Sequence, residues 1–294
     1  MSGSGDRHSP APAVLNDASK RAGFFLKPVP LSEFTFYLVG LLFVQYWAGF
    51  AAMLLSHLSA ETLANEFAQV SVLPVIEWYM LFGFIRRVGN RPISPALAYG
   101  SLALIVAASV GVHHQRIAFL VETLALLAAW IAVPGLRRVG AILLMIALQH
   151  PQWLTPLHGL ISGFDAQTVS GVMSLIGHPV TRTGNMIISA GMPDGMIVLA
   201  GCASSNLMVP MGLGLAVLLV ASRDRLTGAD FGWIGITLAI AFAINIVRLC
   251  LMLQSHAAYL SWHIGTGASY VSVGGLIVTL AAWFAATGRD EARA

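Results

Sequence analysis

The chain has 294 residues, of which 57% are hydrophobic and only 10% are charged. Soluble domains carry about 25% charged residues, so the composition excludes an ordinary soluble domain and predicts an integral membrane protein. The net charge of +3 comes from basic residues scattered at the ends of apolar runs, without the patch or stripe that nucleic-acid binding requires. Two cysteines are too few for a disulfide framework.

The chain opens with residues 1–30, whose Ser-, Pro-, Ala- and Gly-rich composition predicts a disordered tail. Apolar runs follow, and each approaches the ~20 residues that cross a bilayer as a helix. They cover roughly 34–56, 70–86, 95–113, 117–135, 139–156, 204–222, 231–253 and 268–287. The fifth run is the weakest, because His150, Pro151 and Gln152 interrupt it.

The basic residues give the predicted orientation. In an arrangement of about eight transmembrane helices, all of the 16 basic residues except Arg116, Arg182 and Arg248 lie on one side. The positive-inside rule assigns that side to the cytoplasm. The tail 1–30 and the end 288–294 are therefore predicted to be cytoplasmic, with helices one to five in 31–156 and helices six to eight in 204–287.

The same orientation places the connection 157–203 outside the cytoplasm. Asp165 as a helix N-cap and Gly177 as a stop predict a short amphipathic helix lying at the membrane surface. Two short strands are predicted around Thr183-Gly184-Asn185, and GMIVLAG (195–201) is a third strand-like stretch. The predicted fold is thus an all-α polytopic membrane protein with a small extracytoplasmic α/β cap. The second outer connection, 254–267, is expected to be a loop.

Cys202 lies where this cap meets the sixth apolar run. Cysteine is often a small buried hydrophobe, and that interpretation suits Cys250 inside the seventh run. Ser204 and Ser205 are typical N-cap residues, so Cys202 is predicted to lie beside a helix N-terminus. The amide groups and the positive dipole end found there stabilise a thiolate, which is the form that attacks a carbonyl carbon.

Two further residues belong to the same outer side. Arg248 is an arginine inside the apolar run ITLAIAFAINIVRLCLMLQ, and it is either a snorkelling side chain or an inward, hydrogen-bonded one. Asn245 lies three residues earlier, on the same helical face, which favours the inward position. His263 precedes the eighth run, with His256 as a rival nearby.

A thiol, a guanidinium and an imidazole on one side of the membrane can perform acyl transfer. The imidazole of His263 serves as acid and base, the thiol of Cys202 as nucleophile, and Arg248 holds the substrate carbonyl or its oxyanion. Asn245, Ser204 and Ser205 neighbour these groups and are predicted to bind substrate. No cofactor or metal is predicted, because adjacent histidines at 113 and 114 are poorly spaced for shared ligation on a helix.

The order of these motifs resembles the exosortase/archaeosortase family of polytopic membrane transpeptidases. The matching stretches are GHPVTRTGNMI, VLAGCASSNL, AINIVRL and WHIGTG, within roughly 165–287. The family's G-x-x-V-x-x-x-G-N pattern falls on Gly177, Val180, Gly184 and Asn185. The chain departs from the family in the Ala-Ser-Ser-Asn that follows its cysteine.

The resemblance implies a cysteine protease or transpeptidase of the bacterial inner membrane, with its site facing the periplasm or exterior. Its partners would be membrane lipids and exported proteins that end in a sorting signal, namely a short motif, a transmembrane helix and a basic tail. Cleavage would pass through a thioacyl-enzyme and would be tied to exopolysaccharide or surface-protein export. The family's roles carry over as Cys202 nucleophile, Arg248 stabiliser and His263 acid/base.

Two other functions stay open at the level of sequence. Glu77 and Glu122 are ionisable groups inside apolar runs, and such groups often line the ion or proton paths of transporters. The chain shows no internal repeat, however, and many transporters have one. A non-catalytic assembly subunit of an envelope polysaccharide system is the third possibility, although it gives no reason for the three residues to share a side.

Overall fold

A computed structural model describes residues 30–56, 72–88, 93–111, 115–131, 133–149, 156–223 and 225–291. The predicted tail lies outside these residues except for Pro30, and so does the interruption at 150–152. The long apolar helices are α2 (Leu31–Ser56), α4 (Val72–Ile85), α5 (Pro95–Gly111), α6 (Gln115–Trp130), α7 (Pro134–Leu148), α9 (Ser205–Ser222), α10 (Gly228–Met252) and α12 (Thr266–Glu291). Each falls on one of the predicted apolar runs, and α12 continues through most of the predicted tail 288–294.

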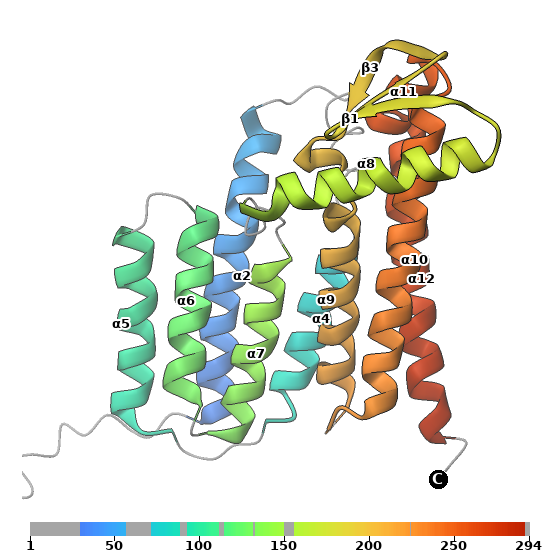
Figure 1. The fold of residues 1–294 in the computed structure, drawn as a ribbon. Helices are drawn as coiled ribbons and strands as arrows, with labels where there is room; N and C mark the ends of the chain where they lie inside the picture. Colours follow the sequence, from blue (N-terminus) through green and yellow to red (C-terminus); the bar gives the residue numbers. More distant parts are fainter. Residues whose placement is uncertain are drawn as a thin grey trace, which may run out of the picture.

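These helices run side by side as a bundle (Figure 1). Helix α8 (His158–Leu175) crosses one end of it, and a three-stranded sheet and the short helix α11 (His256–His263) lie at that same end. Helix α9 packs against α4, α7, α10 and α12. The C-terminus lies at the opposite end (Figure 1), so α9 descends from the sheet, α10 returns to it and α12 descends again.

Three of the described helices are both long and apolar enough to cross a membrane: α9, α10 and α12 over Thr266–Gly288. Helix α4 and the apolar parts of α5 and α6 are shorter, at 10 to 17 residues. The structure is therefore that of a mainly helical membrane protein. The count of eight crossings stays a prediction.

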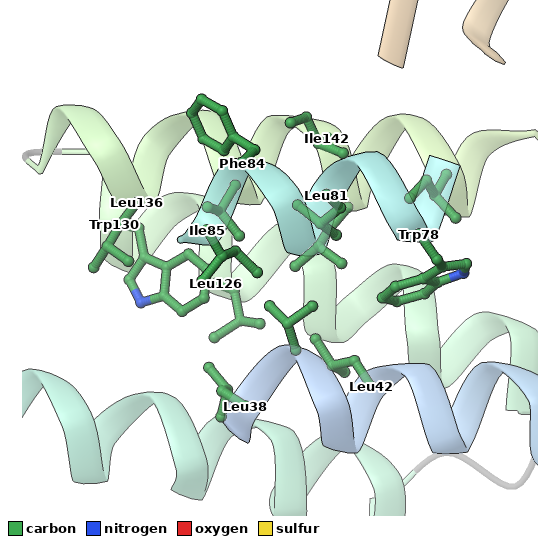
Figure 2. Packing of buried hydrophobic residues seen from close by; sticks show 14 of the residues in the cluster. Leu38, Leu42, Trp78, Leu81, Phe84, Ile85, Leu126, Trp130, Leu136 and Ile142 are labelled. Carbon is green, nitrogen blue, oxygen red and sulfur yellow. The ribbon is translucent and has the colours of Figure 1, made fainter. Parts of the chain in front are cut away.

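The largest core joins α2 to α4, α6 and α7. Its buried side chains include Leu38 and Leu42 of α2, Trp78 and Leu81 of α4, and Ile142 of α7, and Figure 2 shows them interleaved. The helices are apolar on every side, as lipid contact requires, so close packing of large side chains selects which faces meet. One polar atom of this core is paired within it: the indole nitrogen of Trp130 donates to Ser101 Oγ at 3.0 Å.

Helix α8 is longer than the sequence predicted. It begins at His158, so Asp165 is a mid-helix residue and the prediction that it caps this helix is wrong. Apolar residues at Leu160, Ile161 and Phe164 extend the helical spacing upstream, and Asp165 is held by another element instead. The predicted stop is correct: Gly177 has φ 81°, and the next amide, that of His178, donates back to Met173 O at 2.9 Å.

The strands form an antiparallel sheet in the order β1 (Val180–Thr183), β2 (Met186–Ser189) and β3 (Met192–Ile197). Thr183 pairs with Met186 around the predicted turn, where Gly184 has φ 62°. The third strand begins three residues earlier than predicted and ends before the chain enters a short 3-10 helix, η2 (Ala200–Cys202). Residues 256–263, predicted as loop, form α11.

The far end of the bundle gathers arginines. Arg87 follows α4, Arg138 lies near the start of α7 and Arg223 caps the end of α9, and the three line one cavity of about 260 Å³. Arg223 also pairs with Asp230 of α10 and donates to the backbone oxygen of Ala286 in α12. These arginines were predicted to share a side, and they do lie together, at the end away from α8 and the sheet.

Candidate active site

Cys202 is the last residue of η2, between β3 and α9. Its side chain is only 5% exposed and packs in an apolar cluster with residues of α8, the sheet and the end of α10. Its amide donates to Leu199 O at 2.9 Å. Helix α9 begins three residues later at Ser205, with Ser204 as N-cap. The predicted position beside a helix N-terminus is therefore correct.

The N-terminus of α9 is occupied by a carboxylate. Ser204 donates its amide to Asp165 Oδ2 at 2.6 Å and its hydroxyl to Asp165 Oδ1 at 2.8 Å. Asp165 is fully buried. The Ser204 amide, a donor expected to favour a thiolate at this helix end, is thus already bound to the side chain of Asp165.

Burial raises the pKa of the Cys202 thiol, and the nearby charge of Arg248 offsets only part of that rise. Burial thus favours the protonated thiol, in contrast to the thiolate that the helix N-terminus was expected to favour. A base must remove the proton before or during attack on a carbonyl.

Asn245 supports the backbone of the cysteine. It is 2% exposed, and its side-chain amide donates to Cys202 O at 3.0 Å. Inside the same segment, Asn206 Nδ2 donates to Ala200 O at 2.8 Å. The turn that carries Cys202 is thus held by α8, by α10 and by α9.

Arg248 lies one turn before the end of α10, on the face predicted from Asn245. Its Nε donates to Trp262 O at 2.8 Å and its Nη2 to His263 O at 3.3 Å. These carbonyls close the last turn of α11, where a cation also meets the negative end of the helix dipole. Arg248 therefore points inward and ties α11 to α10.

His263 is the last residue of α11 and packs against Tyr259, with ring centroids 5.0 Å apart. Burial lowers the pKa of His263, and the positive charge of Arg248 lowers it further. The imidazole is neutral at pH 7 and can accept a proton. His256, at the other end of α11, is exposed.

A cavity of about 730 Å³ joins these groups, a size typical of ligand sites. Arg248, His263 and Asn245 line it, together with Gly201 of the turn that carries Cys202 (residues 200–204, the cysteine turn) and Asn206 of α9. The rest of its wall is formed by Leu207, Ile264, Gly265, Thr266, Ala268, Ser269, Val271 and Ser272. Cys202 itself does not line the cavity: it is buried next to Gly201, which does, and α12 supplies another part of the wall.

The other residues predicted to bind substrate are placed differently. Ser204 and Ser205 are buried, at 3% and 4% exposure, and neither lines the cavity. Asp165 was not identified from the sequence as part of the site. The sequence signal for Asp165 was an acidic residue among small and apolar ones in HGLISGFDAQTVSGVM. Its hydrogen-bond partner, Ser204, is 39 residues away, so the contact could not be identified from local sequence. Within the described ranges, no cluster of His, Cys, Asp or Glu is able to hold a metal ion.

A family model described as transmembrane exosortase matches residues 65–282, which include every residue of this site. Neither the curated proteins nor the solved structures contain a match to the chain.

Proposed function

The chain belongs to the transmembrane exosortase family, and we propose that it is a cysteine-dependent membrane protease or transpeptidase acting on C-terminal sorting signals of exported proteins. One observation carries the proposal: a single cavity wall combines the Cys202 turn with the only cation and the only imidazole among the described residues that line it. The substrates are exported proteins that end in a short motif, a transmembrane helix and a basic tail. Release of such proteins serves surface-protein or exopolysaccharide export.

The chemistry begins with the protonated thiol. As Cys202 Sγ attacks the scissile carbonyl carbon, His263 takes the thiol proton. The carbonyl oxygen becomes an oxyanion, which the guanidinium of Arg248 stabilises. Collapse of this intermediate breaks the C–N bond, and the leaving amine takes the proton from His263. Attack of an acceptor amine or of water on the thioester then releases the product and restores the thiol.

The proposed setting is the bacterial inner membrane, crossed by eight helices. Both termini are cytoplasmic in this arrangement, and α8, the sheet and α11 lie at the periplasmic or exterior face. The gathering of Arg87, Arg138 and Arg223 at the far end supports it. The catalytic groups then lie outside the apolar span, except Arg248, whose α10 ends one turn later.

Replacement of Cys202 by Ala tests the proposal, with Cys250→Ala as the matched control. Both thiols are buried, but Cys250 lies within α10, outside the cysteine turn that contributes Gly201 to the cavity. A co-expressed protein with a sorting signal should accumulate uncut with Cys202→Ala and be processed normally with Cys250→Ala. A thioester adduct on Cys202, detected by mass spectrometry, is the positive result. Normal processing by folded Cys202→Ala protein refutes the proposal.

The two intramembrane glutamates do not favour a transporter. Glu77 accepts a hydrogen bond from Gln149 of the α7 end at 2.7 Å, and Glu122 accepts one from Gln45 of α2 at 2.9 Å. Each carboxylate thus links two helices. We expect Glu77→Gln to leave cleavage within about threefold of wild type, since buried amide pairs can replace such contacts. Ion flux in liposomes that depends on Glu77 would instead favour transport.

A further inference from the structure

Asp165 is a buried carboxylate for which the cleavage chemistry above gives no role. It lies in the middle of α8 with no exposed surface. Both of its oxygens are bonded, and both bonds go to Ser204, two residues after Cys202. A carboxylate is costly to bury unless its hydrogen bonds are complete. The two hydrogen bonds from Ser204 therefore stabilise Asp165 in its buried position, and they connect it to the segment that carries Cys202.

The cysteine turn is anchored at its reactive residue and two residues after it. Asn245 of α10 holds the carbonyl of Cys202, and Asp165 of α8 holds the amide and hydroxyl of Ser204. Ala203 between them is 1% exposed. With these anchors in place, the backbone of residues 202–204 has little freedom to change the position of the thiol.

We propose that Asp165 is a positioning residue, which acts through Ser204 to hold the cysteine turn, and with it the Cys202 thiol, in place beside the cavity; this role rests on the proposed function of the cysteine. Burial raises the pKa of Asp165, and its two hydrogen bonds from Ser204 oppose part of that rise. As a carboxylate it accepts both bonds in charge-assisted form and lies at the positive end of the α9 dipole. Asp165 is fully buried and both of its oxygens are bonded to Ser204, so it is placed to act through that residue.

A purely structural carboxylate would stabilise α8 without affecting the thiol. Ser162 provides the comparison: it lies one turn earlier on α8 and is 2% exposed. Its hydroxyl donates only to His158 O of its own helix, at 2.6 Å. Ser162→Ala therefore perturbs a buried polar group of α8 without touching the cysteine turn.

The experiment uses the full-length protein in a Cys250→Ala background, so that Cys202 is the single thiol. Rates of alkylation by iodoacetamide are measured beside kcat and KM. Loss of charge-assisted hydrogen bonds predicts that Asp165→Ala lowers kcat by about 10- to 100-fold, with KM within about threefold. The freed turn exposes the thiol, and alkylation becomes about tenfold faster. Ser162→Ala should match the background protein in all three measurements.

Two more variants assign the effect to the Ser204 contact. Asp165→Asn keeps an acceptor oxygen in the same shape, so it should recover most of the lost kcat. If Asp165 acts through Ser204, the double variant Asp165→Ala/Ser204→Ala should lose no more kcat than Asp165→Ala alone. If Asp165→Ala does not fold, Ser204→Ala removes one of the two bonds and should raise alkylation severalfold.

The results separate this proposal from the cleavage function. Alkylation of the Cys202 thiol needs no substrate. Faster alkylation in Asp165→Ala therefore supports the positioning role even if normal processing by Cys202→Ala has refuted the cleavage function. Unchanged alkylation and kcat in folded Asp165→Ala protein overturn the proposal. Additive losses in the double variant overturn it as well, because the two residues would then act independently.

Discussion

Arg248 acts on its surroundings by charge and by hydrogen-bond geometry, and two substitutions separate these effects. Arg248→Gln removes the charge and keeps an amide donor. Arg248→Lys keeps the charge and loses the planar arrangement of donors. In the structure the guanidinium donates to Trp262 O and His263 O while its charge acts on Cys202 and His263.

The expected sizes follow from these contacts. A hydrogen bond from a charged group contributes about 1.5–3 kcal/mol, and Arg248 is partly exposed, so either variant should lose about 1–3 kcal/mol of unfolding free energy. Loss of a donor to the oxyanion lowers kcat by about 100- to 1000-fold. We expect that loss for Arg248→Gln and a smaller one for Arg248→Lys, which retains a cation at the cavity.

The pH dependence of Cys202 alkylation, again without Cys250, identifies the electrostatic part. Because the charge of Arg248 lowers the pKa of Cys202, its removal in Arg248→Gln should move the alkylation midpoint to higher pH. The same charge lowers the pKa of His263, so the acid limb of kcat/KM should also move to higher pH. Arg248→Lys should shift both much less. Unchanged midpoints in Arg248→Gln refute the coupling.

Three further predictions concern neighbouring contacts. His263→Ala should lower kcat by about 100- to 10,000-fold, whereas His256→Ala, at the exposed end of α11, should leave kcat within about threefold of wild type. Because the pKa of His263 is lowered, the acid limb of kcat/KM in the wild type should lie below pH 6.5. Asn245→Ala leaves the buried carbonyl of Cys202 unpaired, so a thermal melt in detergent should show a loss of about 1–3 kcal/mol; an unchanged melt contradicts this. Gly191→Ala places a Cβ against the backbone oxygen of Gln254 and should lower the Tm by several degrees, because the backbone must move. Gly171→Ala, with open space around it, should not.

The sequence predicted the features that depend on local pattern. Apolar runs give helices wherever they occur, because a backbone in lipid must satisfy its own hydrogen bonds. Gly177 and Gly184 marked backbone positions with positive φ that glycine adopts at no cost. The Asn245 and Arg248 pair gave the inward face of α10, since residues three apart share a side.

The features that sequence reasoning missed depend on partners distant in the chain. Asp165 was interpreted by its preference for helix starts, but a bond to Ser204, 39 residues away, decided its position. The resting protonation state of Cys202 follows from burial by α8, the sheet and α10, which no local pattern reveals. Helix α11 had a local signal, since Ser255 caps it by accepting from the Ala258 amide at 3.1 Å. Its eight residues are too few for a clear apolar period.

The protonation states at rest also bear on how the site works. With a thiol and a neutral imidazole, Cys202 and His263 form no ion pair in the free protein, and the charge of Arg248 opposes protonation of His263. In the proposed mechanism an oxyanion forms beside Arg248 during attack and neutralises its charge. The neutralised Arg248 then opposes protonation of His263 less than it does in the free protein. This change coincides with the step in which the imidazole must hold the thiol proton. One arginine thereby keeps the base free before the reaction and allows it to carry charge within it.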